Sequence, residues 1–253
     1  MAWQCSGNSN DSLIDNLIGA DIIRSNSVEM AMRKTDRADY APNDVYADRP
    51  QRIGYDVTIS APHMHAHALE ELADQLQPGA RVLDVGSGSG YLTAVSNQKV
   101  YLSKLRRYLC SNPVVLYFFL SFNCFSKCMA RMVGTQGKVI GLDYVRGLTD
   151  MTTTNLKKSD QDLLDSGVIE VVLADGWNGW TPEAPYDVIH VGAAAATLPQ
   201  KLVDQLKPGG RMIIPVGPQG GKQYLVAITK EKSGSIKQEN LMGVRYVPLV
   251  QKR

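Results

Sequence analysis

The chain has 253 residues, of which 44% are hydrophobic, enough to bury one substantial core and typical of a single α/β domain. The formal net charge of +2 is close to balance, and no basic block or aromatic-interleaved stripe is present, so we expect no nucleic-acid partner. The four cysteines form no CxxC pair, as in a reducing compartment. The polar N-terminus lacks a signal-peptide pattern, which favours a cytosolic protein.

The first part of the chain, residues 1–78, is predicted to form helices and loops ahead of the main sheet. Residues 10–18 combine a polar cap with apolar residues at helical spacing. A second helix is predicted over 27–34, and the turn residues of 40–50 predict a loop. We expect this addition to provide the substrate-binding surface.

A strand and a helix are predicted next to each other further on. Val57 to Ile59 is β-rich, Ser60 is a candidate N-cap, and Pro62 suits the first turn of a helix. That helix carries three histidines, His63, His65 and His67. Because their spacing cannot place all three rings on one helix face, we expect no metal site.

The stretch Arg81 to Thr93 combines a buried strand with a glycine hinge that opens onto a helix. Glycine lets backbone N–H groups approach a ligand closely, so this hinge is predicted to hold a nucleotide-like cofactor. A dinucleotide fingerprint would have a small residue where this chain has Tyr91, which argues against a dehydrogenase. The pattern Asp-x-Gly-x-Gly-x-Gly instead resembles the first motif of the Rossmann-like S-adenosylmethionine methyltransferases. A tight turn without a ligand is the alternative.

Further strands are predicted in alternation with helices, as in a doubly wound, mostly parallel sheet. One of these strands ends at Asp143. The others cover 168–173, 186–191, 212–216, 223–228 and 245–250. Asp143 ends the second strand, where a carboxylate can accept hydrogen bonds from both ribose hydroxyls; a helix cap is the alternative. Asp175 and Gly176 follow the third strand, at the edge where ligands bind in open sheets, although a simple turn has the same pattern.

One longer segment resembles a particular family. Thr58-Ile59-Ser60-Ala61-Pro62-His63-Met64-His65, followed by Leu83-Asp84-Val85-Gly86-Ser87-Gly88-Ser89-Gly90, closely resembles the protein-L-isoaspartate (D-aspartate) O-methyltransferases. Later segments agree in family order: 137–143, 184–195, 206–211 and 244–249. The resemblance covers almost the whole chain and implies a Rossmann-like methyltransferase core over 79–253, with residues 1–78 on the substrate side.

The resemblance also implies a set of site residues. Ser60 is expected to contact and orient the substrate carboxylate, while Val57, Thr58 and Ile59 lie against cofactor and peptide. His65 is expected near the methionine end of the cofactor. The remaining expected cofactor-binding residues are Asp84, Gly86, Ser87, Gly88, Ser89, Asp143, Tyr144, Asp175 and Gly176, with Asp84 as an organiser of the loop.

The implied reaction is methyl transfer from S-adenosyl-L-methionine to the free carboxylate of L-isoaspartyl and D-aspartyl residues in damaged proteins, with S-adenosyl-L-homocysteine as product. A carboxylate is already ionised at neutral pH, so catalysis requires positioning more than acid–base help. The alternatives are a methyltransferase for another carboxylic acid and a product impaired in cofactor binding. We expect a monomer without membrane partners, because no extra apolar stripe is present outside residues 95–127.

Residues 95–127 form an intruding segment. All four phenylalanines of the chain lie within it, and Asp143 comes more than twice as far after Gly90 as the roughly 20 residues expected. Removing 95–127 restores that spacing and joins two halves of a helix pattern. The segment is either a translated intron or a real insertion; its apolar run, 114–122, is much shorter than the ~20 residues a bilayer requires.

Overall fold

The computed structural model describes residues 5–93 and 129–251. Within them, one seven-stranded sheet has the order β5-β4-β3-β6-β7-β8-β9. The strands are β3 (Arg81–Val85), β4 (Lys138–Asp143), β5 (Ile169–Leu173), β6 (Tyr186–Val191), β7 (Leu206–Val216), β8 (Gln223–Lys230) and β9 (Ile236–Val244). Neighbours from β5 to β7 are parallel, and β8 and β9 are antiparallel additions. This mostly parallel sheet confirms the predicted Rossmann-like fold.

The apolar runs of the central strands are explained by cores on both faces of the sheet. Val82, Val139 and Val188 belong to one buried cluster. The residues that follow each of them, Leu83, Ile140 and Ile189, belong to a second. Because successive side chains of a strand point to opposite faces, a strand covered on both sides has no polar alternation.

Helices cover the two faces unequally. The first cluster packs under α6 (Met129–Val133), α7 (Arg146–Ser159) and α8 (Gln161–Asp165), and the second under α9 (Gln200–Asp204). The short 3-10 helix η2 (Thr181–Glu183) precedes β6. The carboxyl ends of β3, β4 and β6 meet at one edge, where ligands bind in open parallel sheets.

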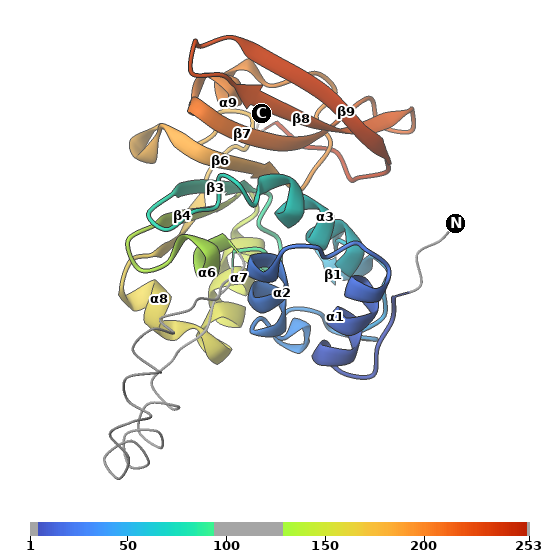
Figure 1. Cartoon of the computed structure of the whole chain (residues 1–253). Coiled ribbons are helices and arrows are strands. Elements are labelled where there is room, and N and C mark those ends of the chain that lie inside the picture. Colours follow the sequence, from blue (N-terminus) through green and yellow to red (C-terminus); the bar gives the residue numbers. More distant parts are fainter. Residues whose placement is uncertain (1–4, 94–128, 252–253) are drawn as a thin grey trace, which may run out of the picture.

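The N-terminal part adds to the face that carries α6 and α7. It contains α1 (Asn10–Gly19), α2 (Asn26–Arg33), η1 (Arg37–Asp39), the antiparallel hairpin β1 (Gln51–Gly54) and β2 (Val57–Ile59), and α3 (Pro62–Leu72). Figure 1 shows these blue to teal elements beside α6 and α7. A buried link joins the two parts: the Tyr40 hydroxyl donates to Asp160 at 2.9 Å, and Asp160 pairs with Arg131 at 3.3 Å.

Three local predictions are corrected. The cap of α1 is Ser9, which exchanges side-chain hydrogen bonds with Ser12. Ser60 is not an N-cap, because α3 begins at Pro62 and its cap residue is Ala61. The last strand is Ile236–Val244, whereas most of 245–250 is irregular and only Pro248 forms an isolated bridge, to Ala194.

The predicted insertion, 95–127, lies outside the described residues. Next to it, Tyr91 to Thr93 form a turn rather than the predicted start of a helix, and α6 begins at Met129. Over residues 5–93 and 129–251, no helix combines the length and apolar character needed to cross a membrane. In the same residues no cluster of three or more His, Cys, Asp or Glu side chains is arranged to hold a metal ion.

Candidate active site

The loop after β3 takes its shape from three glycines. Gly86, Gly88 and Gly90 have φ angles of 75°, 55° and 86°, a left-handed region that side chains other than glycine rarely adopt. A Cβ on Gly90 would also approach Cγ2 of Thr152 to 2.9 Å. The Thr152 hydroxyl in turn donates to the Gly88 carbonyl at 2.9 Å. The loop is therefore fixed against α7 with its amides near the ends of the strands.

Asp84, the last acidic residue before this loop, is buried and has both oxygens occupied. Its Oδ2 accepts a hydrogen bond from Oγ1 of Thr93 at 2.7 Å, and its Oδ1 lies 2.8 Å from Nδ1 of His190 on β6. Asp84 therefore joins β3, β6 and the far side of the glycine loop. This geometry agrees with an organising role for Asp84.

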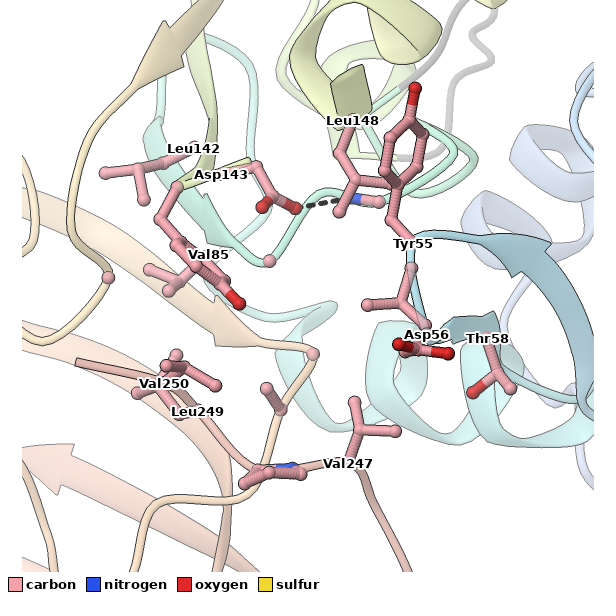
Figure 2. A pocket seen from close by; sticks show the side chains of 18 of the residues that line it. Tyr55, Asp56, Thr58, Val85, Leu142, Asp143, Leu148, Val247, Leu249 and Val250 are labelled. Atoms are coloured by element: carbon pink, nitrogen blue, oxygen red, sulfur yellow. Dashed lines mark hydrogen bonds between the residues drawn. The ribbon is translucent and has the colours of Figure 1, made fainter. Parts of the chain in front are cut away.

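Asp143 connects the end of β4 to the same loop. Its Oδ2 accepts from the Gly88 amide at 3.3 Å, the dashed line of Figure 2, and its Oδ1 accepts from the Val145 amide at 3.2 Å. Burial raises the pKa of this carboxyl above the ordinary aspartate value, although the backbone amides around it oppose that rise. Each oxygen retains a lone pair for a further donor.

A cavity of about 360 Å³ lies over these strand ends. Figure 2 shows Val85, Leu142 and Asp143 on one side, Tyr55, Asp56 and Thr58 of the β1–β2 hairpin opposite, and Val247, Leu249 and Val250 on a third. Its lining residues are Tyr55, Asp56, Val57, Thr58, Val85, Gly86, Gly88, Leu142, Asp143, Tyr144, Leu148, Gly176, Gly192, Ala193, Gln219, Val247, Pro248, Leu249 and Val250. We call it the outer cavity.

A second, smaller cavity of about 40 Å³ shares residues with the first and is mostly polar. We call it the inner cavity. It is lined by Thr58, Ile59, Ser60, His65, Asp84, Gly86, Ser87, Gly88, Ser89, Tyr91, Leu92, His190 and Gly192. The Oγ of Ser87 is buried here and has no hydrogen-bond partner among the residues that the structure describes, which is costly unless a ligand or water completes it.

Ser60 lies between the N-terminal addition and the C-terminal segment. Its carbonyl accepts from Nη2 of Arg37 at 2.9 Å. Its side chain interacts with that of Tyr246, where it partly opposes the rise that burial causes in the pKa of the Tyr246 hydroxyl. Tyr246 is itself fixed by Gln223, whose Oε1 accepts from the Tyr246 amide at 2.7 Å. The Ser60 backbone is therefore held by the N-terminal addition, and its side chain lies against the C-terminal segment.

The structure brings most of the predicted site residues together. The fourteen residues from Val57 to Gly176 named above line one or both cavities, except for Asp175. The Asp175 carboxylate instead accepts from the Trp177 amide at 2.9 Å and from the Asn178 side chain at 3.3 Å, as in a turn. Of the three histidines, His65 lines the inner cavity, and His63 pairs with Asp48 at 2.7 Å.

Other residues that line the cavities or contact their walls were not predicted. His190 had a signal in the sequence, because it is a polar residue within the apolar strand Tyr186–Val191. Arg37, which contacts Ser60 and His65, had none, since a charged residue in a polar stretch normally lies in solvent. The lining residues 247–250 were interpreted as a strand instead.

The cavities fit S-adenosylmethionine. The outer cavity combines apolar walls, Leu142 and Leu249, with the acceptor Asp143 and glycines that leave room for a ligand, as a nucleoside requires. The inner cavity supplies polar groups for an amino-acid end, including the Ser87 hydroxyl, to which no described residue is hydrogen-bonded. The sheet and these two adjacent cavities define a Rossmann-like S-adenosylmethionine-dependent methyltransferase.

Comparison with known proteins identifies the family. The model of the family "Protein-L-isoaspartate(D-aspartate) O-methyltransferase (PCMT)" matches residues 8–105 and 124–253. The chain therefore belongs to the protein-L-isoaspartate(D-aspartate) O-methyltransferase family. The positions skipped between the two matched ranges fall within 95–127.

Relatives agree over nearly the whole length. The protein-L-isoaspartate O-methyltransferase of Caenorhabditis elegans is 41% identical over 98% of this chain and 96% of its own. Protein-L-isoaspartate O-methyltransferase 1 of Arabidopsis thaliana is 41% identical over 98% and 94%. A crystal structure from Plasmodium falciparum, described as a protein-L-isoaspartate O-methyltransferase in complex with S-adenosyl-L-homocysteine, superimposes with a TM-score of 0.79 at 33% identity, covering 97% of this chain and 100% of that one.

Proposed function

We propose that the protein transfers a methyl group from S-adenosyl-L-methionine to the free carboxylate of L-isoaspartyl and D-aspartyl residues in damaged proteins and peptides. The observation that carries this proposal is the adjacency of the two cavities in a member of this family: the outer cavity, of about 360 Å³, shares wall residues with the small polar inner cavity that Ser60 lines. We also propose that the protein is a cytosolic monomer that acts on neither nucleic acids nor membranes.

The chemistry requires little from the side chains beyond positioning. S-adenosylmethionine, when bound, supplies an electrophilic methyl group. The substrate carboxylate is ionised at neutral pH, since its ordinary pKa is about 4, so no general base is needed. Ser60 donates its hydroxyl to one carboxylate oxygen and directs the other toward the reacting methyl. Holding the reacting atoms in line and excluding water provides most of the acceleration.

The remaining residues hold and cover the two ligands. Asp143 would accept hydrogen bonds from the ribose hydroxyls, with Tyr144 and Gly176 beside the adenine. The backbone of Val57 to Ile59 would lie between cofactor and peptide. Gly86 to Ser89 and His65 would surround the amino-acid end. Asp175 would act through the turn that carries Gly176, because its carboxylate faces that turn.

Methylation of a matched pair of peptides tests this function. A peptide with one L-isoaspartyl residue is expected to accept methyl groups from labelled S-adenosylmethionine, and the same peptide with ordinary aspartate is not. The Ser60→Ala variant is expected to lose about tenfold or more in kcat/KM while its affinity for S-adenosylhomocysteine is unchanged. Ser27→Ala, on the exposed side of α2, is the control. Equal transfer to a free carboxylic acid would contradict the proposed substrate.

The domain organisation that we propose is one methyltransferase domain with a cofactor core over 79–253, a substrate-side addition over 1–78, and an inserted segment at 95–127. Calorimetric titration of S-adenosylhomocysteine into the full chain and into a variant lacking 95–127 tests the last point. Equal affinities are expected if the segment leaves the cofactor site intact. Binding by the shortened variant alone would mean that the full chain is impaired.

A further inference from the structure

Arg37 is a fully buried cation at the boundary between the N-terminal addition and the active site. Its side chain comes from η1 and has no solvent exposure. Within residues 5–93 and 129–251, no carboxylate lies within ion-pair distance of its guanidinium, and its Nε has no hydrogen-bond partner. A buried charge without a counterion is costly to a fold. Its contacts should therefore explain what it does.

Those contacts all lead to groups that line the inner cavity. Nη2 donates to the Ser60 carbonyl at 2.9 Å, and Nη1 lies 3.4 Å from Nδ1 of His65. The guanidinium carbon is 5.4 Å from the centre of the Tyr91 ring, which packs against the His65 ring at 4.9 Å. One cation thus contacts Ser60, His65 and the residue that ends the glycine loop.

The contact with His65 determines where the imidazole carries its proton. A guanidinium can only donate, so Nδ1 of His65 must accept from Arg37. A neutral imidazole that accepts at Nδ1 carries its proton on Nε2. His65 lines the inner cavity, and Nε2–H is then the only N–H donor that its ring can offer there.

The surroundings keep His65 neutral as well as fixed. Burial lowers the pKa of His65 well below its ordinary value, and the charge of Arg37 lowers it further. His190 from β6 and His63 from the same helix act in the same direction. The carboxylate of Asp84, which also lines the inner cavity, is hydrogen-bonded to His190 and Thr93. Arg37 itself stays charged at neutral pH, because burial lowers its pKa only to about 10.

We propose that Arg37 is a positioning residue of the active site that locks His65 in the Nε2–H tautomer and fixes the Ser60 backbone, so that the inner cavity presents a neutral N–H donor to a carboxylate. This inference rests on the proposed function. It goes beyond that function by assigning the proton of His65 and a role to a residue that lines neither cavity. The ligand class it implies is a carboxylate, held without an imidazolium that would titrate near neutral pH.

Nitrogen NMR of the four histidines, in protein labelled with ¹⁵N-histidine, measures the tautomer directly. A His65→Gln variant assigns the signal. In the native protein, His65 is expected to show a protonated Nε2 and an unprotonated Nδ1 that do not titrate between about pH 5 and about pH 8, the range in which histidine ordinarily changes charge. A protonated Nδ1, or ordinary titration, would overturn the proposal without any variant of Arg37.

Substitution of Arg37 supplies the second readout. Arg37→Met, which keeps most of the volume, is expected to let His65 exchange between tautomers and titrate, and to lower kcat/KM for an isoaspartyl peptide about tenfold or more. Arg37→Lys, compared with Arg37→Met, should restore part of the fixed His65 tautomer and part of kcat/KM. The control is Arg131→Met, which removes another buried arginine, paired with Asp160, and should cost stability without altering the His65 signal. A folded Arg37→Met variant with an unchanged His65 signal contradicts the proposal.

The two proposals can fail separately. Absence of methyl transfer to the isoaspartyl peptide by the native protein contradicts the proposed function, whereas the His65 tautomer is measured with or without S-adenosylhomocysteine and does not depend on turnover.

Discussion

The Asp143 carboxylate accepts a hydrogen bond from the backbone amide of Gly88 at 3.3 Å, so the end of β4 and the glycine loop after β3 form one unit. The two residues lie on opposite sides of the stretch 95–127 in sequence. The contact shows that the described parts before and after that stretch close around the same cavity. A ligand that binds Asp143 therefore also lies next to the glycine loop.

Asp143→Asn is expected to weaken binding of S-adenosylhomocysteine about tenfold or more, because the amide replaces one acceptor oxygen with a donor that faces a backbone N–H or a ribose hydroxyl. Isothermal titration measures this change. Asp187→Asn is the control, since Asp187 lies at the opposite end of the sheet and bonds to Arg81 and Lys207. Equal losses in both variants would show that Asp143 is merely structural.

The pH dependence of that binding follows from the raised pKa of Asp143. The ionised carboxylate is the better acceptor, so affinity is expected to decline as the pH falls through this pKa, which lies above the ordinary aspartate value. The decline should be missing in Asp143→Asn, which has no proton to gain. A parallel decline in the native protein and the variant would assign it to another group.

Much of the fold could be predicted because central strands are fixed by burial on both faces. The sequence predicts short apolar strands that end at Asp143 and Val191, and β4 and β6 do end at those residues. Strand β9 was missed because it lies at the sheet edge and exposes Lys237, Gln238 and Glu239, where no apolar pattern is required.

The segment after β9 shows the opposite error. Residues 246–250 are mostly apolar and include two valines, as in a strand, but their side chains serve a different purpose. Four of them line the outer cavity. Their backbone is held by hydrogen bonds to separate parts of the chain. The Val247 carbonyl accepts from the Ala194 amide at 2.8 Å, and the Leu249 amide donates to the Ala194 carbonyl at 2.8 Å. The Leu249 carbonyl accepts from the Trp177 ring at 2.9 Å. Sequence alone cannot distinguish burial in a sheet from burial over a cavity.

Gly176→Ala is expected to perturb the cofactor site through packing alone. An added Cβ would meet Cγ1 of Val85 at 2.6 Å and Cδ1 of Leu249 at 3.0 Å, so it would displace a wall of the outer cavity. Overpacking of this kind costs about 1–3 kcal/mol, and affinity for S-adenosylhomocysteine should fall with it. Gly243→Ala, where a Cβ meets no atom of the described residues within 4 Å, is the control. Unchanged affinity in Gly176→Ala would show that this wall does not contact the ligand.

Asp48→Asn is expected to destabilise the protein by about 1–3 kcal/mol at neutral pH, measured by urea unfolding. Burial alone would raise the pKa of the Asp48 carboxyl, but the hydrogen bonds from the ring and amide of His63 outweigh it, so the net pKa is lowered. A lowered acid pKa stabilises the fold above the ordinary value of 3.8 and loses that contribution as the pH falls through the lowered value. The difference between native protein and variant should therefore shrink in strong acid.

The control for that effect is Asp11→Asn. Asp11 pairs with Arg33, but its side chain is 76% exposed, and solvent screens such a pair to within about 0.5 kcal/mol. If both variants lose the same stability, the contact between Asp48 and His63 contributes no more than a surface ion pair.

Tyr246→Phe is expected to separate substrate positioning from cofactor binding. The variant keeps the ring and removes only the hydroxyl that interacts with the Ser60 side chain. Without that partner, the Ser60 hydroxyl can rotate away from the substrate carboxylate, and a small misplacement of reacting groups is costly to rate. We expect kcat/KM for an isoaspartyl peptide to fall about tenfold, with the affinity for S-adenosylhomocysteine unchanged.

Combining the substitution with Ser60→Ala tests whether Tyr246 acts through Ser60. If it does, the double variant is no slower than Ser60→Ala alone, because residues that act as a unit are not additive. Tyr224→Phe, on an exposed ring of β8, controls for the loss of a tyrosine hydroxyl. Additive losses in the double variant would mean that Tyr246 affects the reaction independently of Ser60. One route would be through the neighbouring residue Val247, which lines the outer cavity.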